Sequence, residues 1–305
     1  MSRSSSLPVL AMLDKIKAAI SRRSGLRSSE TDACRLVNGA GDGLDGLIID
    51  DFAGRWLISS KGEEALPKLT SEVGYRALYS KTLSKNEKLA PAHLGGELLT
   101  ARFPVQEHGL SYWIDFQSGY SQGLFLDQRL NRQRLREFCP GKTVLNTFAY
   151  TCSFGVAAVF AGAKAVNLDL SRNYLEWGQE NYRLNGLKPE GSDFIYGDVF
   201  DWLGRFAKRD RRFDLVILDP PTFSRSKTSG VFRADQDYGA LLERALRVIE
   251  PGGILLCCLN AHHVSGTEFR YILKDSLPSS VDLRQMGMPE DFPGSDYLKS
   301  FWVHL

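Results

Sequence analysis

Carboxylates that directly follow apolar stretches are the residues of this sequence best suited to binding a nucleoside. Residues 144–145 read as a buried strand, the segment 147–155 as a tight loop, and residues 166–168 as a second buried strand that ends in Asp169. A strand, a tight loop, a helix and a second strand ending in an acid bind adenosine-containing cofactors, because the acid accepts hydrogen bonds from the ribose hydroxyls. We therefore predict that Asp169 binds a ribose.

The loop segment 147–155 carries a single glycine, Gly155, and lacks the Gly-x-Gly-x-x-Gly motif that lets a backbone approach a pyrophosphate. This composition disfavours an NAD-dependent oxidoreductase. Thr151, Cys152 and Ser153 suit a cofactor without phosphate, and we predict S-adenosylmethionine.

A second candidate site begins at Asp219, where the apolar run 215–218 meets two consecutive prolines, the first of them Pro220. Two prolines neither continue a helix nor pair within a central strand, so they make a rigid turn. Asp219 can then present its carboxylate to an amino-bearing heterocycle on which Phe223 stacks. We therefore take Asp219 and Pro220 as candidate catalytic residues.

Two further acids lie beside predicted helix starts. Asp127 and Arg129 are expected to line the cofactor site. Asp198 either accepts a hydrogen bond from an adenine amino group or caps the helix that begins at Val199, and both roles can hold.

Several residues could contact phosphates. Ser224 and Lys227 lie in a predicted basic, hydroxyl-rich loop, for which a plain surface loop is an equally good interpretation. Two groups of arginines suit either a solvated helix face or contacts with a polyanion. These groups are Arg22, Arg23 and Arg27, and Arg132, Arg134 and Arg136.

Strands and helices alternate in the second half of the chain. We predict strands at 143–147, 165–169, 193–197, 213–219 and 253–259, helices at 154–162, 171–185, 199–207, 236–249 and 266–276, and a terminal hairpin region. This alternation indicates an α/β fold with a Rossmann-like, doubly wound parallel sheet. Ligands bind such sheets at the carboxyl ends of the strands. This would bring the loop at 147–155, the acids Asp169, Asp198 and Asp219, and Asn260 together at one edge of the sheet.

The first part of the chain reads as a smaller α+β unit. We predict a tail and helix at 1–32, a small α+β domain at 33–118 and the cofactor-binding domain at 119–305. Within the small domain, hairpins are expected around 47–59 and 103–116, and a helix from residue 65 leads into a weak strand ending at 83.

Composition bounds the function classes. The formal net charge is +2 at pH 7, so any surface for nucleic acid must be local. No apolar run is long enough to cross a membrane. The 5 cysteines show no metal-ligand or disulfide spacing, which fits a reducing cytoplasm and predicts no metal site.

Four motifs carry a resemblance to a known family. They are Asn146-x-Phe148-x-Tyr150-Thr151, the run 169–177 beginning Asp169-Leu170-Ser171, Asn185-Gly186-Leu187, and Asp219-Pro-Pro-Thr-Phe-Ser. These motifs resemble the class I S-adenosylmethionine-dependent methyltransferases of bacterial 23S ribosomal RNA, of which one branch methylates cytosine C5 and another guanine N7. Together with the strand-end argument, the resemblance implies cofactor contacts by Phe125, Asp127, Arg129, Asn146, Phe148, Tyr150, Thr151, Asp169, Leu170, Asp198, Val199 and Asp219.

Two features depart from the cytosine-C5 branch. That branch carries an N-terminal PUA RNA-binding domain, for which we expect no counterpart here. It also uses a cysteine nucleophile, and the matching position is Asn260, as in the guanine branch. Cys257 and Cys258 fall within the preceding strand and are expected in the core.

The resemblance implies ribosomal RNA as the partner. A small-molecule or protein acceptor on the same scaffold, or a non-catalytic RNA-binding factor, remain alternatives. The sequence leaves a monomer and a homodimer open.

Overall fold

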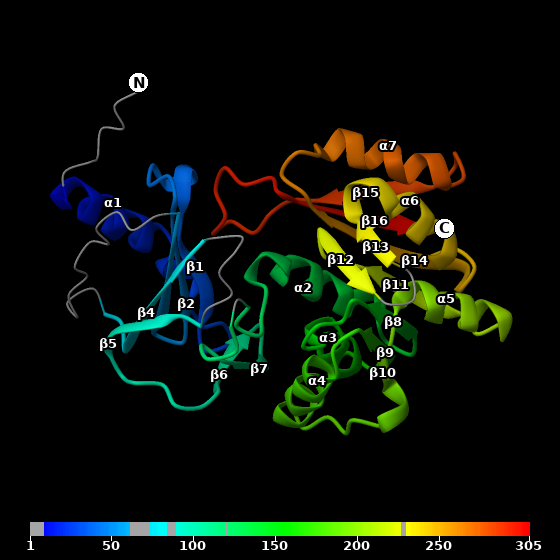
Figure 1. The fold of residues 1–305 in the computed structure, drawn as a ribbon, viewed down its shortest axis with the longest axis horizontal. Helices are drawn as coiled ribbons and strands as arrows, with labels where there is room; N and C mark the ends of the chain where they lie inside the picture. The colour runs from blue at the N-terminus through cyan, green and yellow to red at the C-terminus, as the bar shows by residue number, and fades with distance from the viewer. Residues whose placement is uncertain (1–8, 62–73, 84–89, 120, 227–229) are drawn as a thin grey trace. The chain divides into compact units, whose positions relative to one another are not determined.

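The computed structural model describes residues 9–61, 74–83, 90–119, 121–226 and 230–305 (Figure 1). The chain divides into two compact units. Unit 1 comprises Met1–Leu126 and Pro289–Ser295, and unit 2 comprises Asp127–Met288 and Asp296–Leu305. The helix expected from residue 65 lies outside the described residues up to position 73, and so does Lys227.

Unit 1 is built on a five-stranded sheet with the order β1-β2-β3-β4-β5. Neighbouring strands are antiparallel except β3 and β4, which are parallel. The predicted hairpins are confirmed, as is the weak strand, which is β4. The elements are α1 (Val9–Arg22), β1 (Ala33–Asn38), β2 (Leu47–Phe52), β3 (Arg55–Ser60), β4 (Ala77–Thr82), β5 (Ala92–Gly96), and the hairpin of β6 (Phe103–Glu107) and β7 (Leu110–Ile114).

The first group of arginines is used inside unit 1. Arg23 is 4% exposed and donates to both carboxylate oxygens of Asp42, at 3.1 and 2.7 Å. Burial raises the pKa of Asp42, but the hydrogen bonds from Arg23, the Asn38 N–H and Arg22 outweigh it and lower the pKa below its ordinary value. Arg27 pairs with the buried Asp51. A solvated helix end and a phosphate-contacting edge are therefore both wrong for Arg23.

The segment Pro289–Ser295 returns to unit 1 late in the chain. The Arg35 N–H donates to the Asp291 carboxylate at 2.8 Å, and Asn38 Nδ2 donates to the Pro293 carbonyl at 2.8 Å. A Cβ at Gly41 would lie 1.8 Å from that carbonyl oxygen, so the close approach needs glycine. These contacts join the segment to unit 1, which extends to Leu126, whereas the cofactor-binding domain was expected from residue 119.

Unit 2 contains a seven-stranded sheet with the order β10-β9-β8-β11-β14-β16-β15. The first five strands are parallel to one another, and β16 runs antiparallel to both of its neighbours, β14 and β15, which confirms the doubly wound sheet and the terminal hairpin region. The strands are β8 (Thr143–Thr147), β9 (Lys164–Asp169), β10 (Phe194–Tyr196), β11 (Phe213–Leu218), β14 (Ile249–Asn260), β15 (Asp282–Met286) and β16 (Leu298–His304).

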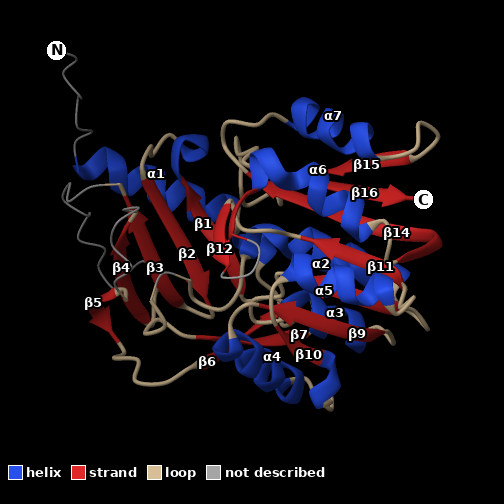
Figure 2. Ribbon diagram, turned by 45° about the vertical axis from the view of Figure 1, so that its right-hand side comes forward, coloured by secondary structure: helices blue, strands red, loops and turns tan. Residues whose placement is uncertain are grey.

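Helices cover the sheet in two layers (Figure 2). The helices α2, α3 and α4 pack in succession, and so do α5, α6 and α7. The central strands read as apolar runs because both of their faces are covered: Leu145, Val216 and Leu256 are fully buried. The helices are α2 (Arg129–Phe138), α3 (Ser153–Phe160), α4 (Arg172–Leu184), α5 (Val199–Lys208), α6 (Ala234–Ala245) and α7 (Gly266–Ser276).

One helix approaches the loop after β8 so closely that only glycine fits. A Cβ at Gly178 of α4 would lie 2.3 Å from the Cys152 Sγ and 2.8 Å from its Cβ. We expect Gly178→Ala to lower the free energy of unfolding by about 1–3 kcal/mol, because the overpacked contact forces α4 or the loop to shift.

The matched control is Gly204→Ala, also inside a helix, where an added Cβ meets nothing within 4 Å. That change should be neutral or stabilise by about 0.5–1 kcal/mol, as alanine does in open helix positions. Urea unfolding of both variants checks the contrast, and equal effects would contradict it.

Candidate functional site

The loop after β8 has an unusual backbone. Phe148, Tyr150 and Cys152 have φ values of +52°, +50° and +61°, a region that side chains other than glycine rarely adopt. Each such residue costs on the order of 1 kcal/mol and persists only where its surroundings hold it. Backbone outliers of this kind cluster at ligand sites, so the loop is a candidate binding element.

Contacts from three neighbouring elements hold the loop. Thr147 Oγ1 donates to the Ile217 carbonyl of β11 at 2.6 Å. The Ala149 N–H donates to the Leu168 carbonyl of β9 at 3.0 Å. Asn181 Nδ2 of α4 donates to the Thr151 carbonyl at 2.9 Å.

Asp169 lies directly against this loop. Its Oδ2 accepts from the Tyr150 N–H and its Oδ1 from the Ser171 N–H, both at 2.8 Å. Burial raises the pKa of Asp169, while hydrogen bonds from backbone N–H groups lower it. Each carboxylate oxygen has more than one acceptor position, so the pair can also accept from a vicinal diol. The geometry brings together the loop and the acid that the sequence singled out.

Asp198 connects the next strand end to a helix. Its Oδ1 accepts from the Asp201 N–H at 3.2 Å, so it caps α5, as one of the two interpretations predicted. The preceding Gly197 N–H donates to the Asp169 carbonyl at 2.9 Å and ties the ends of β9 and β10 together. Val199 is 2% exposed in the core, which leaves only its backbone for the predicted cofactor contact.

Asp219 ends a chain of buried hydrogen bonds that the sequence analysis missed. Trp302 Nε1 donates to Asn131 Oδ1 at 3.1 Å, and Asn131 Nδ2 donates to Gln128 Oε1 at 2.7 Å. Gln128 Nε2 then donates to Asp219 Oδ2 at 2.9 Å. Because every amide in this chain is oriented by its neighbour, the Asp219 carboxyl is fixed in place.

The electrostatics of this carboxyl are also set by its surroundings. Burial and the nearby Asp127 carboxylate raise the pKa of Asp219 to about 7, against smaller lowering effects from the Gln128 hydrogen bond and Arg132. Asp127 Oδ2 in turn accepts from the Tyr297 hydroxyl at 3.0 Å. Two acids expected at the site therefore do influence each other.

The ends of β11 and β14 are joined beside Asp219. Tyr238 of α6 donates to the Leu218 carbonyl at 3.0 Å, and Thr222 Oγ1 donates to the Asn260 carbonyl at 2.7 Å. Because β11 and β14 are parallel neighbours, Asp219, which follows β11, and Asn260, the last residue of β14, lie at the same edge of the sheet. The structure thus places this predicted pair at one edge.

Cys257 and Cys258 are core residues, as predicted. Both are fully buried in β14. Burial raises the pKa of Cys257 to about 12 and that of Cys258 well above its ordinary value. Neither thiol is suited to form a thiolate at neutral pH.

Other predicted positions need correction. Ser224 lies in β12 (Phe223–Ser226), which pairs with β13 (Gly230–Arg233), so the predicted open loop is wrong there. Phe223 is 55% exposed. Lys227 lies outside the described residues.

The second arginine group does not form a solvated basic face. Arg129 and Arg132 are buried at 4% and 2% exposure, the latter beside Ser153 at 3.5 Å. Arg134 and Arg136 lie over the rings of Phe138 and Phe160. Arg134 also lies over the ring of Trp302, and the contacts with Trp302 and Phe160, which come from other elements, could not be predicted from the arginine pattern.

Four further cofactor candidates are buried in packing contacts, exposed to solvent or stacked on another ring. Asn146 is buried and its Nδ2 donates to Asn167 Oδ1 at 2.9 Å, so packing between β8 and β9 accounts for it without a ligand. Phe125 and Leu170 are exposed, at 48% and 39%. Phe148 stacks on Phe232 of β13 with ring centroids 6.1 Å apart.

No group of three or more potential metal ligands occurs among the described residues. None of the helices in the described part of the chain is long and apolar enough to cross a membrane.

Comparison with known proteins identifies the family. Residues 65–301 match the family described as S-adenosylmethionine-dependent methyltransferase. YwbD of Bacillus subtilis, named provisionally as a ribosomal RNA large subunit methyltransferase, is 34% identical over 309 residues, covering 93% of this chain and 77% of YwbD. Ribosomal RNA large subunit methyltransferase I of Aeromonas hydrophila is 33% identical over 311 residues, covering 95% of this chain and 78% of that protein.

A solved structure agrees. The crystal structure of SMU.776, named provisionally as a methyltransferase and complexed with SAH, matches with a TM-score of 0.88 and 28% identity, covering 99% of this chain and 83% of that one. The parallel sheet with acid-tipped strands and a strained loop is that of the class I methyltransferases. The chain belongs to the S-adenosylmethionine-dependent methyltransferase family, and S-adenosylmethionine is its cofactor.

The raised pKa of Asp219 gives a pH-dependent prediction. From its ordinary value near 3.8 up to about 7, the folded protein keeps a proton that the unfolded chain releases, so this group makes stability fall as pH rises. Asp219→Asn is neutral throughout and removes that effect. The stability of the variant relative to wild type should increase by about 2 kcal/mol between pH 5 and pH 8. Urea unfolding at both pH values measures it, and a difference that does not change with pH would refute the assignment.

Proposed function

We propose that this methyltransferase acts on a base of large-subunit ribosomal RNA, at an atom that already carries a lone pair. The observation that carries the proposal is the pair of adjacent strand ends bearing Asp219 and Asn260, beside the loop held by Asp169, with both β14 thiols buried below. The names of the relatives in Bacillus and Aeromonas supply the RNA class. Such an acceptor places the enzyme in the cytoplasm.

In this proposal Asp169 binds the ribose of the cofactor through the acceptor positions that Tyr150 and Ser171 leave. Phe148 contributes an aromatic face, and the ends of β9 and β10 close the site at Asp198. When bound, S-adenosylmethionine supplies an electrophilic methyl group. The remaining proposed cofactor contacts are those of Phe125, Asp127, Arg129, Asn146, Thr151, Leu170, Val199 and Asp219.

The acceptor base is held by the proline-stiffened turn. Asp219 and Asn260 would bind the edge of the base, since a carboxyl and an amide can accept from its amino groups. Pro220 is buried and keeps the turn extended, and the exposed Phe223 ring can stack on the base, with Ser224 close by in sequence. A base within folded RNA has to leave its stack to reach this turn.

The buried thiols favour a ring nitrogen such as guanine N7 over cytosine C5. Methylation at C5 needs a nucleophile that first adds to C6, whereas a ring nitrogen needs only alignment and desolvation. Asn260 stands where the cytosine-C5 branch carries its cysteine. Cys257 lies within the strand, with a pKa raised to about 12 by burial.

Replacement of the two thiols tests this point. We expect Cys257→Ser and Cys258→Ser to keep more than half of the methyl-transfer rate, because neither sulfur takes part. Thermal unfolding of each variant controls for loss of fold. A variant that folds normally but has lost its activity would support methylation at cytosine C5 with a cysteine nucleophile.

The cofactor assignment is tested at Asp169. Asp169→Ala should weaken S-adenosylmethionine binding about 100-fold or more in calorimetry, since it removes two hydrogen bonds to a charged group, each worth about 1.5–3 kcal/mol. The matched control is Asp214→Ala, because Asp214 holds Thr143 at the opposite, amino end of β8. Equal affinities in the two variants would contradict the ribose assignment.

The acceptor is tested with RNA from a strain that lacks the gene. Wild-type enzyme with labelled S-adenosylmethionine should transfer label to large-subunit RNA, and Asp169→Ala should not. Mass analysis of the nucleosides then identifies the methylated base. Label found only in protein or small molecules would refute the RNA acceptor.

A further inference from the structure

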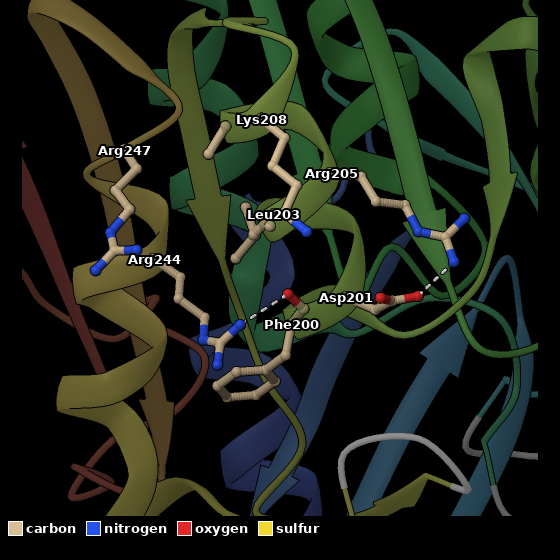
Figure 3. Close-up of a pocket in the computed structure, with 9 residues that line it drawn as sticks. Phe200, Asp201, Leu203, Arg205, Lys208, Arg244 and Arg247 are labelled. Atoms are coloured by element: carbon tan, nitrogen blue, oxygen red, sulfur yellow. Dashed lines mark hydrogen bonds and ion pairs between the residues drawn. The ribbon is translucent and has the colours of Figure 1, made fainter.

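A basic pocket lies between α5 and α6 in unit 2, and it extends from Phe200 in the first turn of α5 to Lys208 at the end of that helix. Its volume is about 520 Å³. Figure 3 shows Arg244 and Arg247 on one side of it and Lys208 on the other. The charged and aromatic side chains that line it are Phe200, Asp201, Arg205, Lys208, Arg244 and Arg247.

Positive charge exceeds negative charge in this pocket. Its single carboxylate, Asp201, is paired with Arg205 at 2.8 Å. Arg244 donates to the Phe200 carbonyl at 3.2 Å and lies over the Phe200 ring, which fixes the guanidinium without neutralising it. The side chains of Lys208 and Arg247 have no hydrogen-bond or ion-pair partner among the residues that the structure describes. The pocket therefore presents three uncompensated cations.

The arginine groups that the sequence suggested for phosphate are otherwise engaged. Arg23 is buried against Asp42, and Arg132 is buried in unit 2. In a chain whose net charge is only +2, an attraction for a polyanion has to come from a local excess such as this one.

Aromatic contacts connect the pocket to the cofactor loop. Phe148 of the loop stacks on Phe232 at 6.1 Å between centroids, and Phe232 contacts Phe200 at 5.6 Å. The Arg244 guanidinium then lies 5.3 Å from the centre of the Phe200 ring. This series of contacts links the cofactor loop to the part of the pocket that Phe200 and Arg244 form.

We propose that the pocket between α5 and α6 binds the phosphate backbone of the acceptor RNA and positions the strand for methyl transfer. This inference rests on the proposed RNA acceptor. Lys208, Arg244 and Arg247 would contact phosphates, and such contacts set position and affinity while they carry no sequence information.

The test is the double variant Lys208→Gln/Arg247→Gln, which leaves Arg244 and its contact with Phe200 intact. We expect about 10-fold weaker binding of a large-subunit RNA fragment, a raised KM for RNA with kcat preserved, and a salt dependence reduced by about 1–2 in slope. Affinity for S-adenosylmethionine should not change. Arg247→Lys keeps the charge and should retain most of the RNA affinity.

The matched control is Lys164→Gln/Lys188→Gln, which removes the same charge from two exposed positions outside the pocket. If this control weakens RNA binding as much as the pocket variant does, the effect is one of net charge and the pocket assignment is wrong. Inorganic phosphate and a mononucleotide are titrated alongside. If the pocket variant loses binding of inorganic phosphate or the mononucleotide but binds RNA as wild type does, the pocket binds a small phosphate ligand and the proposed RNA contact is wrong.

Failure of the two proposals can be told apart. If wild-type enzyme methylates the RNA and the pocket variant behaves like wild type, only the pocket proposal falls. If wild-type enzyme neither binds nor methylates the RNA, the RNA acceptor is wrong and the pocket proposal falls with it.

Discussion

The two hydrogen bonds that Asp169 accepts from the Tyr150 and Ser171 N–H groups hold the rest of the site in place. The loop after β8 passes through three residues of positive φ, a conformation that a free segment of this composition would leave. A carboxylate that binds the loop on one side and the start of α4 on the other fixes both. The acid that suits a ribose thus also shapes the site before any ligand arrives.

A second constraint acts at the end of β11. The hydrogen bonds from Trp302 of β16 through Asn131 and Gln128 reach Asp219, which follows the central strand β11. In this setting burial and the Asp127 carboxylate raise the pKa of Asp219 to about 7. At Asp169 burial also raises the pKa, but hydrogen bonds from backbone N–H groups act against that effect. The two acids are therefore tuned differently although both follow apolar strands. One holds backbone donors, and the other can change its protonation state near neutral pH.

The parts of the fold that could be predicted from the sequence are those that depend on short runs of neighbouring residues. The apolar runs before Asp169 and Asp219 predicted two strands. Because these strands were expected to be parallel, both acids were expected at the same edge of the sheet. The network through Gln128 was not predictable, because its members lie far apart in the chain and only the sheet order brings them together. The predictions for the arginines failed for the same reason. A run of arginines on a helix does not show whether a carboxylate such as Asp42 or an aromatic ring will contact it in the folded protein.

Charge placement would let a nearly neutral protein bind the proposed RNA acceptor. Salt screens exposed charges beyond about 8–10 Å, so the net charge of a chain says little about what one face attracts. Here, many arginines form ion pairs or ring contacts within the two units. The cations that remain uncompensated in the pocket act only on phosphates that come close. A local excess of this kind favours a strand lying in one place over a strand bound anywhere, which is what alignment of a single base requires.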